Sequence, residues 1–103
     1  MEYPELSQLG LSENEIKVYI CLLKLGSSKV EDISQHVSLP RTTIYGLLKS
    51  LFEKGIASNV IKSGVKYFSG IGPEQLVSIQ KEKIQALEKI APALENMKES
   101  VGK

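Results

Sequence analysis

Residues 32–56 read DISQHVSLPRTTIYGLLKSLFEKGI, and this stretch decides the fold. Apolar residues recur at helical spacing on both sides of HVSLP (36–40). A residue that precedes a proline is pushed out of the helical region, whereas proline itself is tolerated in the first turn of a helix. The stretch therefore predicts two helices joined by a tight turn, and the second helix runs from Pro40 to about Lys54, before Gly55.

A further helix is predicted upstream, over SENEIKVYICLLKLG (12–26). It opens with Ser12 and Glu15 at the S-x-x-E spacing of a capping box and closes at Gly26. Its apolar residues form two nearly opposite stripes, which predicts a helix buried between two partners. Cys21 lies in one of these stripes, so we expect a core residue in preference to a reactive thiol.

The shorter helix before the tight turn is expected to begin at a second capping box, formed by Ser28 and Glu31. After the second helix of the pair, IASNVIK (56–62) and VKYFS (65–69) are short β-type runs. Ser63 and Gly64 between them are typical of a hairpin turn. Two helices, a tight turn and a following hairpin predict a winged helix-turn-helix domain.

From Glu74 onward the chain keeps one long helical pattern, which Pro92 should kink or break near Ala91. Its apolar residues stay close to the a/d rhythm of a coiled coil. We expect residues 73–103 to be a dimerisation element; the alternative is a helix that folds back on its own domain. The predicted fold is mostly α with a small β-hairpin (α+β), with the winged domain in residues 1–72. The predicted dimer contacts are Leu76, Ile84, Leu87, Ile90, Leu94 and Met97.

Charge is distributed unevenly along a chain whose net charge is only +1. Residues 1–39 carry 3 basic and 6 acidic groups, whereas residues 40–69 carry 5 basic groups and the single acidic Glu53. A local basic block in a near-neutral chain is the footprint expected of a small module that binds a polyanion. A chance cluster on a solvated face is the alternative.

The helix from Pro40 has one apolar side and one small, polar or cationic side. On a helical wheel the apolar side holds Ile44, Leu47, Leu48, Leu51 and Phe52, which we expect in the core. The opposite side suits the major groove of double-stranded DNA, where arginine pairs with guanine and threonine with base edges or thymine methyls. We predict base contacts from Arg41, Thr42 and Thr43, and backbone contacts from Tyr45, Gly46, Lys49, Lys62, Ser63 and Lys66.

Gly46 is the least expected residue of this helix, because glycine costs about 1 kcal/mol relative to alanine in a helix interior. The absence of a side chain would let the helix backbone approach DNA closely. Alternatives remain open: a tolerated surface glycine or close packing for Gly46, and ordinary solvated positions for Arg41 and for the lysines of the hairpin.

Other classes of protein find little support in the sequence. There are no clustered carboxylates, no metal-ligand spacing for His36, no nucleophile–histidine pairing and no phosphate-binding glycine loop, so we expect neither an enzyme nor a metal or other cofactor. The longest apolar run, VYICLL (18–23), is too short for a bilayer, and the acidic amino terminus lacks a secretion signal. With a single cysteine, these features favour a cytoplasmic protein.

Three segments resemble the DNA-binding domain of the TrmB-like transcriptional regulators, which are largely archaeal winged-helix proteins. They are LGLSENEIKVYICLLKLG (9–26), residues 32–56 and KYFSGIGPEQL (66–76), and the resemblance extends over about residues 6–80. It implies that the helix from Pro40 is the recognition helix, that residues 56–69 are the wing, and that the protein is a homodimer. Ser38 stands where the family often has glycine.

Longer members of that family carry a C-terminal sugar-binding domain, and this chain ends after one helix, so we expect no small-molecule effector. The sequence thus predicts a homodimeric, sequence-specific DNA-binding transcriptional regulator. Two other functions stay open: a winged-helix adaptor that binds another protein, and a chromatin-type protein that coats DNA with little sequence preference.

Overall fold

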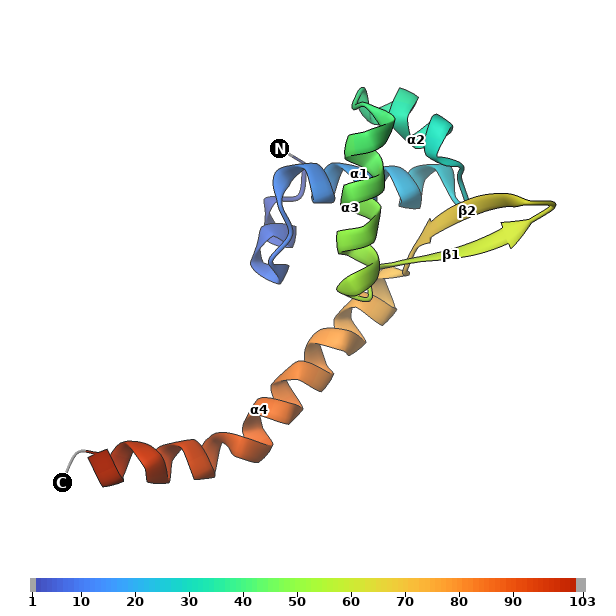
Figure 1. Cartoon of the computed structure of the whole chain (residues 1–103). Coiled ribbons are helices and arrows are strands. Elements are labelled where there is room, and N and C mark those ends of the chain that lie inside the picture. The colour runs from blue at the N-terminus through green and yellow to red at the C-terminus, as the bar shows by residue number, and fades with distance from the viewer. Residues whose placement is uncertain (1, 102–103) are drawn as a thin grey trace. The chain divides into compact units, whose positions relative to one another are not determined.

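The computed structural model describes residues 2–101, with side chains as far as Lys98. The chain divides into two compact units at the junction of Gly72 and Pro73. None of the described helices combines the length and the apolar character that crossing a bilayer requires. The elements in chain order are η1 (Pro4–Leu9), α1 (Glu13–Leu25), α2 (Val30–Val37), α3 (Arg41–Glu53), β1 (Ala57–Lys62), β2 (Val65–Gly70) and α4 (Pro73–Val101) (Figure 1).

The first unit is a winged helix-turn-helix, as the sequence predicts. Helix α1 lies at its centre and packs against α2, α3 and β2. The capping box at its start is confirmed, because Glu15 donates its backbone N–H to Ser12 Oγ at 3.2 Å while Ser12 N donates to Glu15 Oε1 at 2.8 Å. Cys21 is buried in the core, as expected, whereas the last apolar residues of α1, Leu23 and Leu25, are exposed.

The prediction of a second capping box, formed by Ser28 and Glu31, is wrong. Helix α2 begins one residue later than expected, at Val30, with Lys29 as its N-cap and no side-chain cap. Ser28 instead exchanges two backbone hydrogen bonds with Phe68 of β2, at 2.9 and 2.7 Å, and its hydroxyl donates to the Gly26 carbonyl. Pairing with β2 therefore decides the conformation of Ser28. The residue forms an isolated antiparallel bridge beside the hairpin.

The tight turn between α2 and α3 depends on Ser38. This residue adopts the left-handed conformation, with φ 57°, and so closes α2 at the position where glycine would be unstrained. The Ser34 hydroxyl donates to the carbonyl of Leu39 and ties the turn to the end of α2. Pro40 is then the N-cap of α3, which begins at Arg41, one residue after the predicted start.

Helix α3 contributes a narrow apolar stripe to the core. Ile44, Leu48 and Leu51 are buried at i, i+4, i+7 spacing, and Leu47 is partly buried. The core prediction for Phe52 is wrong, since this side chain is 56% exposed. Phe52 lies at the edge of the stripe, where it lines a surface cleft beside the hairpin instead of facing α1.

Strands β1 and β2 form an antiparallel hairpin that runs from Ala57 paired with Gly70 to Lys62 paired with Val65. Ser63 and Gly64 at the tip both have positive φ, 51° and 75°. Positive φ at both central residues is the signature of a type I′ turn, whose twist matches that of the strands. The predicted hairpin and its turn are confirmed.

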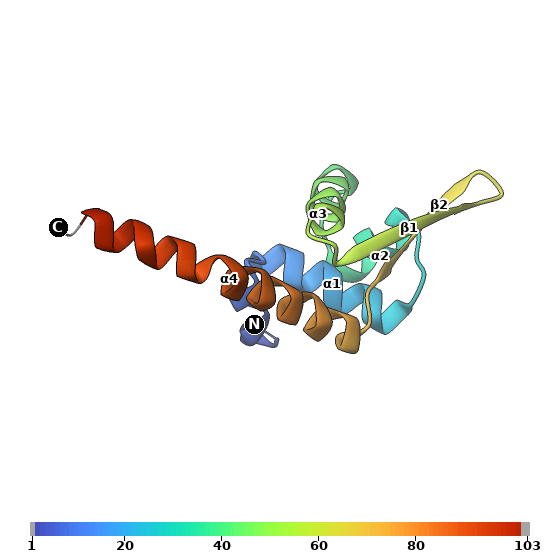
Figure 2. The same cartoon turned by 90° about the horizontal axis from the view of Figure 1, so that it is seen from below.

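The second unit is the single helix α4. It continues through Pro92, so the helix does not break near Ala91, and of the two predicted outcomes only the kink is compatible with the structure. Proline removes one backbone N–H donor and crowds the preceding turn, which bends a helix without ending it when the rest of the ladder is intact. Figures 1 and 2 show the helix running without interruption, and its axis bends in Figure 1.

Candidate nucleic-acid interface

The side of α3 that faces away from the core is uncovered. The predicted contact residues on this helix are all exposed; they are Arg41, Thr42, Thr43, Tyr45, Gly46 and Lys49. An ideal Cβ built on Gly46 meets no atom within 4 Å. Close packing against the described part of the chain is therefore excluded as the reason for this glycine, and an open surface position remains.

The hairpin tip carries the other predicted backbone contacts, Lys62, Ser63 and Lys66, and all three are exposed. The Lys62 ammonium lies 6.0 Å from the centroid of the Tyr67 ring, at the outer limit of a cation–π contact. No carboxylate among the described residues lies within ion-pair distance of Lys49, Lys62 or Lys66.

An open cleft of about 320 Å³ lies between the start of α3 and the hairpin tip, and we call it the α3–wing cleft. The structure brings Arg41, Tyr45 and Lys66 together around it, although Lys66 is distant in sequence. Tyr45, Lys49 and Lys66 also line a second cleft further along α3. Thr42, Thr43 and Gly46 lie on the exposed face but line neither cleft, and the same holds for Lys62 and Ser63.

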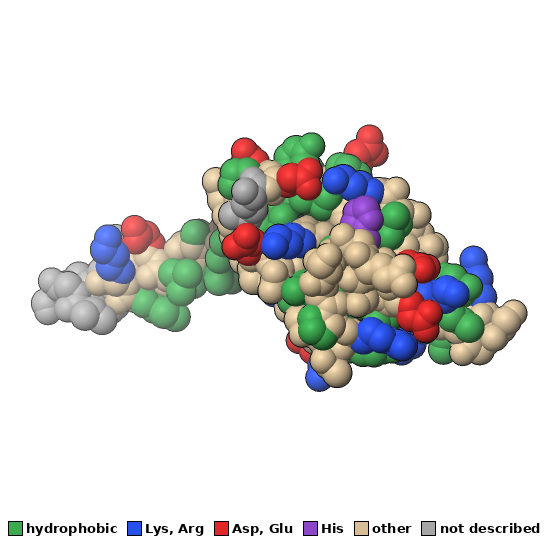
Figure 3. Space-filling view, turned by 90° about the horizontal axis from the view of Figure 1, so that it is seen from above, with side chains coloured by type: hydrophobic (Ala, Val, Ile, Leu, Met, Phe, Trp, Pro, Cys, Tyr) green, Lys and Arg blue, Asp and Glu red, His purple; other side chains and the backbone are tan. Residues whose placement is uncertain are grey.

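Two charged residues of the α3–wing cleft were missed by the sequence interpretation. Lys29 lines the cleft although it belongs to the acidic first third of the chain. Glu31 lines it too, and its carboxylate Oε1 lies 3.7 Å from Nη1 of Arg41. Figure 3 shows the mixture: Lys and Arg side chains gather at the hairpin end of the surface with acidic side chains among them. Lys29 and Glu31 reach the cleft through the packing of α2 beside α3 and the hairpin, for which the local sequence carries no signal.

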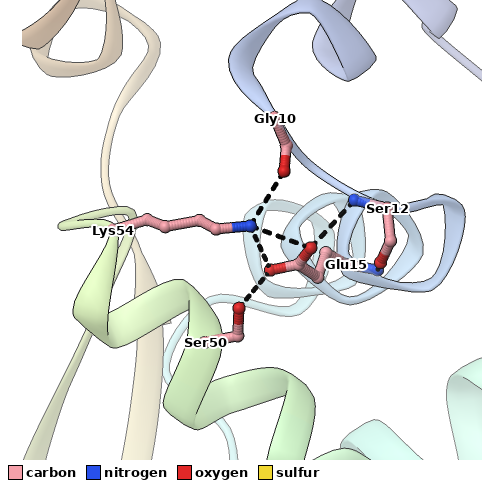
Figure 4. Close-up of polar contacts among 5 residues, drawn as sticks. All are labelled: Gly10, Ser12, Glu15, Ser50 and Lys54. Atoms are coloured by element: carbon pink, nitrogen blue, oxygen red, sulfur yellow. Dashed lines mark hydrogen bonds and ion pairs between the residues drawn. The ribbon is translucent and has the colours of Figure 1, made fainter.

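Lys54 belongs to the basic block of residues 40–69, but its ammonium group is engaged inside the first unit and does not line the α3–wing cleft. Its ammonium donates to both carboxylate oxygens of Glu15, at 3.0 and 2.9 Å, and to the Gly10 carbonyl at 2.8 Å (Figure 4). The Ser50 hydroxyl donates to Glu15 Oε2 at 2.6 Å. This network joins the end of α3 to the start of α1 and thereby fixes the direction of α3.

The network also sets the ionisation of Glu15. Burial by itself would raise the pKa of this carboxyl group, but hydrogen bonds from the Ser12 backbone, Ser50 and Lys54 outweigh it and lower the pKa from 4.5 to about 2. Glu15 is therefore a buried carboxylate that is paired and fully hydrogen-bonded, which is the condition for tolerating such a charge.

His36 lies apart from these residues, exposed on α2, where it lines a different open cleft with Asp32 and Gln35. Within residues 2–98, no group of three or more histidine, cysteine or acidic side chains could hold a metal ion.

Helix α4 carries its predicted contact residues on the surface. Five apolar side chains are 50% to 63% exposed, and they are Ile84, Leu87, Ile90, Leu94 and Met97. Leu76 differs, since it is partly buried.

Comparison with known proteins places these features in a family. Residues 6–74 match the family model described as "Sugar-specific transcriptional regulator TrmB". The HTH-type sugar sensing transcriptional regulator TrmBL1 of Pyrococcus furiosus is 31% identical over 94 residues, which are 90% of this chain and 27% of that protein. An uncharacterized protein of Methanocaldococcus jannaschii is 40% identical over 62 residues, covering 57% of this chain and 52% of its own length. The chain thus spans about a quarter to a half of the curated relatives it matches.

Solved structures share the fold at low sequence identity. A possible transcriptional regulator from Methanosarcina mazei superposes with a TM-score of 0.65 at 20% identity, over 85% of this chain and 80% of that chain. A MarR family protein from Bacillus stearothermophilus gives a TM-score of 0.61 at 15% identity, over 95% of this chain and 80% of that chain. At these identities the likeness shows the winged-helix fold alone.

Proposed function

The chain belongs to the TrmB family of transcriptional regulators, and we propose that it regulates transcription by binding double-stranded DNA sequence-specifically as a homodimer. In this proposal α3 is the recognition helix in the major groove, and the β1–β2 hairpin is a wing on the sugar-phosphate backbone. The observation that carries the proposal is the uncovered outer side of α3, with its small, polar and cationic side chains beside the lysines of the hairpin tip.

Each residue of this surface has a chemical role that its position supports. Arg41, the first residue of α3, presents a fork of donors that suits the O6 and N7 acceptors of guanine. Thr42 and Thr43 follow it in the first turn, where recognition helices contact base edges. Tyr45 and Lys49 lie further along the helix and suit phosphate oxygens, which set the register of the protein on the duplex. Gly46 leaves the helix surface open between them.

The wing adds contacts that are independent of base sequence. Lys62 and Lys66 flank the tip, and the exposed Ser63 hydroxyl lies between them. Their charges would displace counterions from the phosphate backbone, so they contribute to affinity and to its salt dependence more than to base preference. Among the lysines of residues 40–69, only Lys54 is engaged by a carboxylate within the described part of the chain.

The homodimer is proposed from the exposed apolar side chains of α4. A series of large apolar residues that are half or more exposed is unusual for a monomer and typical of an interaction surface. A second copy of the same helix offers the same series, so it is the occupant with matching chemistry. Two copies would read two half-sites about one helical turn of DNA apart.

Selection of bound duplexes from a random pool, at a low and a high salt concentration, tests the proposal as a whole. We expect an enriched pseudo-palindromic site whose affinity falls steeply with salt. A pool that stays random while binding persists would instead show a chromatin-type protein. Failure to retain any duplex at either salt concentration would contradict DNA binding altogether.

Two substitutions test the assignment of α3. Arg41→Ala should relax the preference at one base position, because the bidentate contact to guanine contributes about 1–3 kcal/mol of discrimination. Lys49→Ala should weaken selected and random duplexes by about the same factor, since a phosphate contact carries no base information. If both variants bind as the parent does, α3 is not the recognition helix.

A protein-binding adaptor is the second candidate, and the wing supplies the observation that favours it. Val60, Ile61 and Val65 are exposed on the hairpin, and Phe52 is exposed on α3. Exposed apolar groups of this kind also suit a protein partner. Loss of all duplex binding in the selection experiment would favour this function over DNA recognition.

A further inference from the structure

Glu31 is a carboxylate on a surface that the proposed function assigns to a polyanion. It lines the α3–wing cleft together with the cations Lys29, Arg41 and Lys66. Its Oε1 lies 3.7 Å from Nη1 of Arg41, and the two side chains are 61% and 56% exposed. An acidic group at this position opposes the approach of phosphates, so general affinity for DNA does not account for it.

We propose that Glu31 is a positioning residue for Arg41, which holds the guanidinium for base recognition and lowers its use as a general phosphate contact. This inference rests on the proposed function, because it assigns a determinant of specificity to the same surface. Glu31 extends from the first turn of α2 and Arg41 is the first residue of α3, so the ion pair spans the tight turn.

The geometry of arginine allows both contacts at once. A guanidinium has five N–H donors in a planar fork, and a carboxylate near Nη1 leaves the other donors available. Restricting the rotation of this long side chain reduces the entropy lost when the fork pairs with guanine. The ion pair therefore restricts the guanidinium to fewer orientations, among which, in this proposal, is the one that pairs with guanine.

Electrostatics makes the effect selective. The acceptors on the guanine edge are neutral, so a nearby carboxylate does not repel them strongly, whereas a phosphate carries a full negative charge. Glu31 thus disfavours complexes in which Arg41 turns to the backbone, and those complexes prevail on random DNA. The predicted consequence is a higher ratio of specific to non-specific affinity, at some cost in total affinity.

Asp32 offers a matched control in the same turn of α2. Both residues are exposed and acidic and lie in the first turn of the helix, where a negative charge is favourable. Asp32 lines the separate cleft with His36, and no cation of the described side chains lies within ion-pair distance of it. Asp32→Asn therefore reproduces the change in net charge and in helix stability without touching Arg41.

The experiment compares the affinities of the full chain, Glu31→Gln and Asp32→Asn for the selected duplex and for a random duplex at one salt concentration. For Glu31→Gln we expect the specificity ratio to fall by a factor of about 1.4 to 5, the size expected for a solvent-exposed ion pair, mainly through tighter binding of random DNA. Asp32→Asn should change both affinities by the same factor. Equal ratios for the two variants would overturn the inference.

A third variant separates the route through Arg41 from a general charge effect. In an Arg41→Ala background, Glu31→Gln should leave the specificity ratio unchanged, because its target is gone. A ratio that still falls would overturn the positioning role. The two failures are distinguishable: if the parent chain prefers no duplex, the proposed function itself is contradicted, whereas a selective parent with an insensitive Glu31→Gln contradicts the positioning role alone.

Discussion

The winged-helix unit and α4 differ in the solvent exposure of their large apolar side chains. In the first unit Ile16, Leu22, Ile33 and Leu51 are almost fully buried among α1, α2 and α3. On α4 the series from Ile84 to Met97 is half or more exposed. The first unit therefore has a core of its own, whereas α4 presents apolar surface for which a second chain is the proposed partner. Stability should depend on the first region and assembly on the second.

The largest expected effect is a loss of stability in the first unit. Leu48 is 2% exposed at the centre of the α3 stripe, so Leu48→Ala should lower the free energy of unfolding by about 2–5 kcal/mol through lost burial and a residual cavity. Phe52→Ala is the matched control on the same helix, and its exposed ring should make the loss much smaller. Denaturant unfolding measures both, and equal losses would contradict the division of α3 into buried and exposed sides.

The second prediction concerns assembly. Replacing Leu87 and Leu94 together by lysine should leave the chain monomeric and lower its apparent affinity for a duplex with two half-sites by about 100-fold or more, because two linked binding events become independent. Unfolding of the first unit should be unaffected. Sedimentation and duplex titration measure the two effects.

A control for this variant adds the same charge elsewhere on α4. Gln85 and Asn96 are exposed polar residues that lie opposite Leu87 and Leu94 at 3.6 residues per turn. Replacing both by lysine should preserve assembly. A Leu87 and Leu94 variant that still sediments with the mass of the parent would contradict the dimer through α4.

The third prediction follows from Glu15, whose pKa is lowered to about 2 from 4.5. A carboxyl group with a depressed pKa in the folded state stabilises the fold above its unfolded pKa, and this contribution is lost as pH falls through the folded pKa. The free energy of unfolding should therefore decrease by about 2–3 kcal/mol between pH 5 and pH 2 on account of Glu15.

Glu15→Gln should remove this part of the acid dependence, which unfolding curves at several pH values would measure. Glu13→Gln is the control, because it removes an exposed carboxylate from the same turn of α1. If the two variants lose stability with acid in the same way as each other, the network around Lys54 does not stabilise the fold as described.

Features encoded by neighbouring residues were predicted well. The capping box of Ser12 and Glu15 and the turn at Ser63 and Gly64 each depend on residues no more than three positions apart, and the structure confirms both. The order of these local elements was enough to predict the winged helix. It was also enough to place the outer face of α3 in solvent, although its contacts with DNA stay a prediction.

Features that depend on distant residues were missed. Ser28 and Glu31 have the spacing of a capping box, but the backbone of Ser28 pairs with Phe68. No neighbouring residue in the sequence indicates that pairing. Lys54 belongs to the basic block of the sequence, but its partner is Glu15, 39 residues away. The spacing of Ser28 and Glu31 predicts that Glu31 caps α2, whereas Glu31 lies beside Arg41 across the tight turn. Tertiary pairing overrides local pattern in all three.

The smallest expected effect on stability, and a direct test of the outer face of α3, comes from Gly46. Because a Cβ at this position meets nothing within 4 Å and the residue is helical, Gly46→Ala should raise the free energy of unfolding by about 0.5–1 kcal/mol. Gly46→Leu should also leave the fold intact but obstruct the close approach of α3 to DNA, lowering affinity for the selected duplex. A leucine variant that is folded and binds that duplex as the parent does would show that this side of α3 does not enter the groove, because the larger side chain projects from that side.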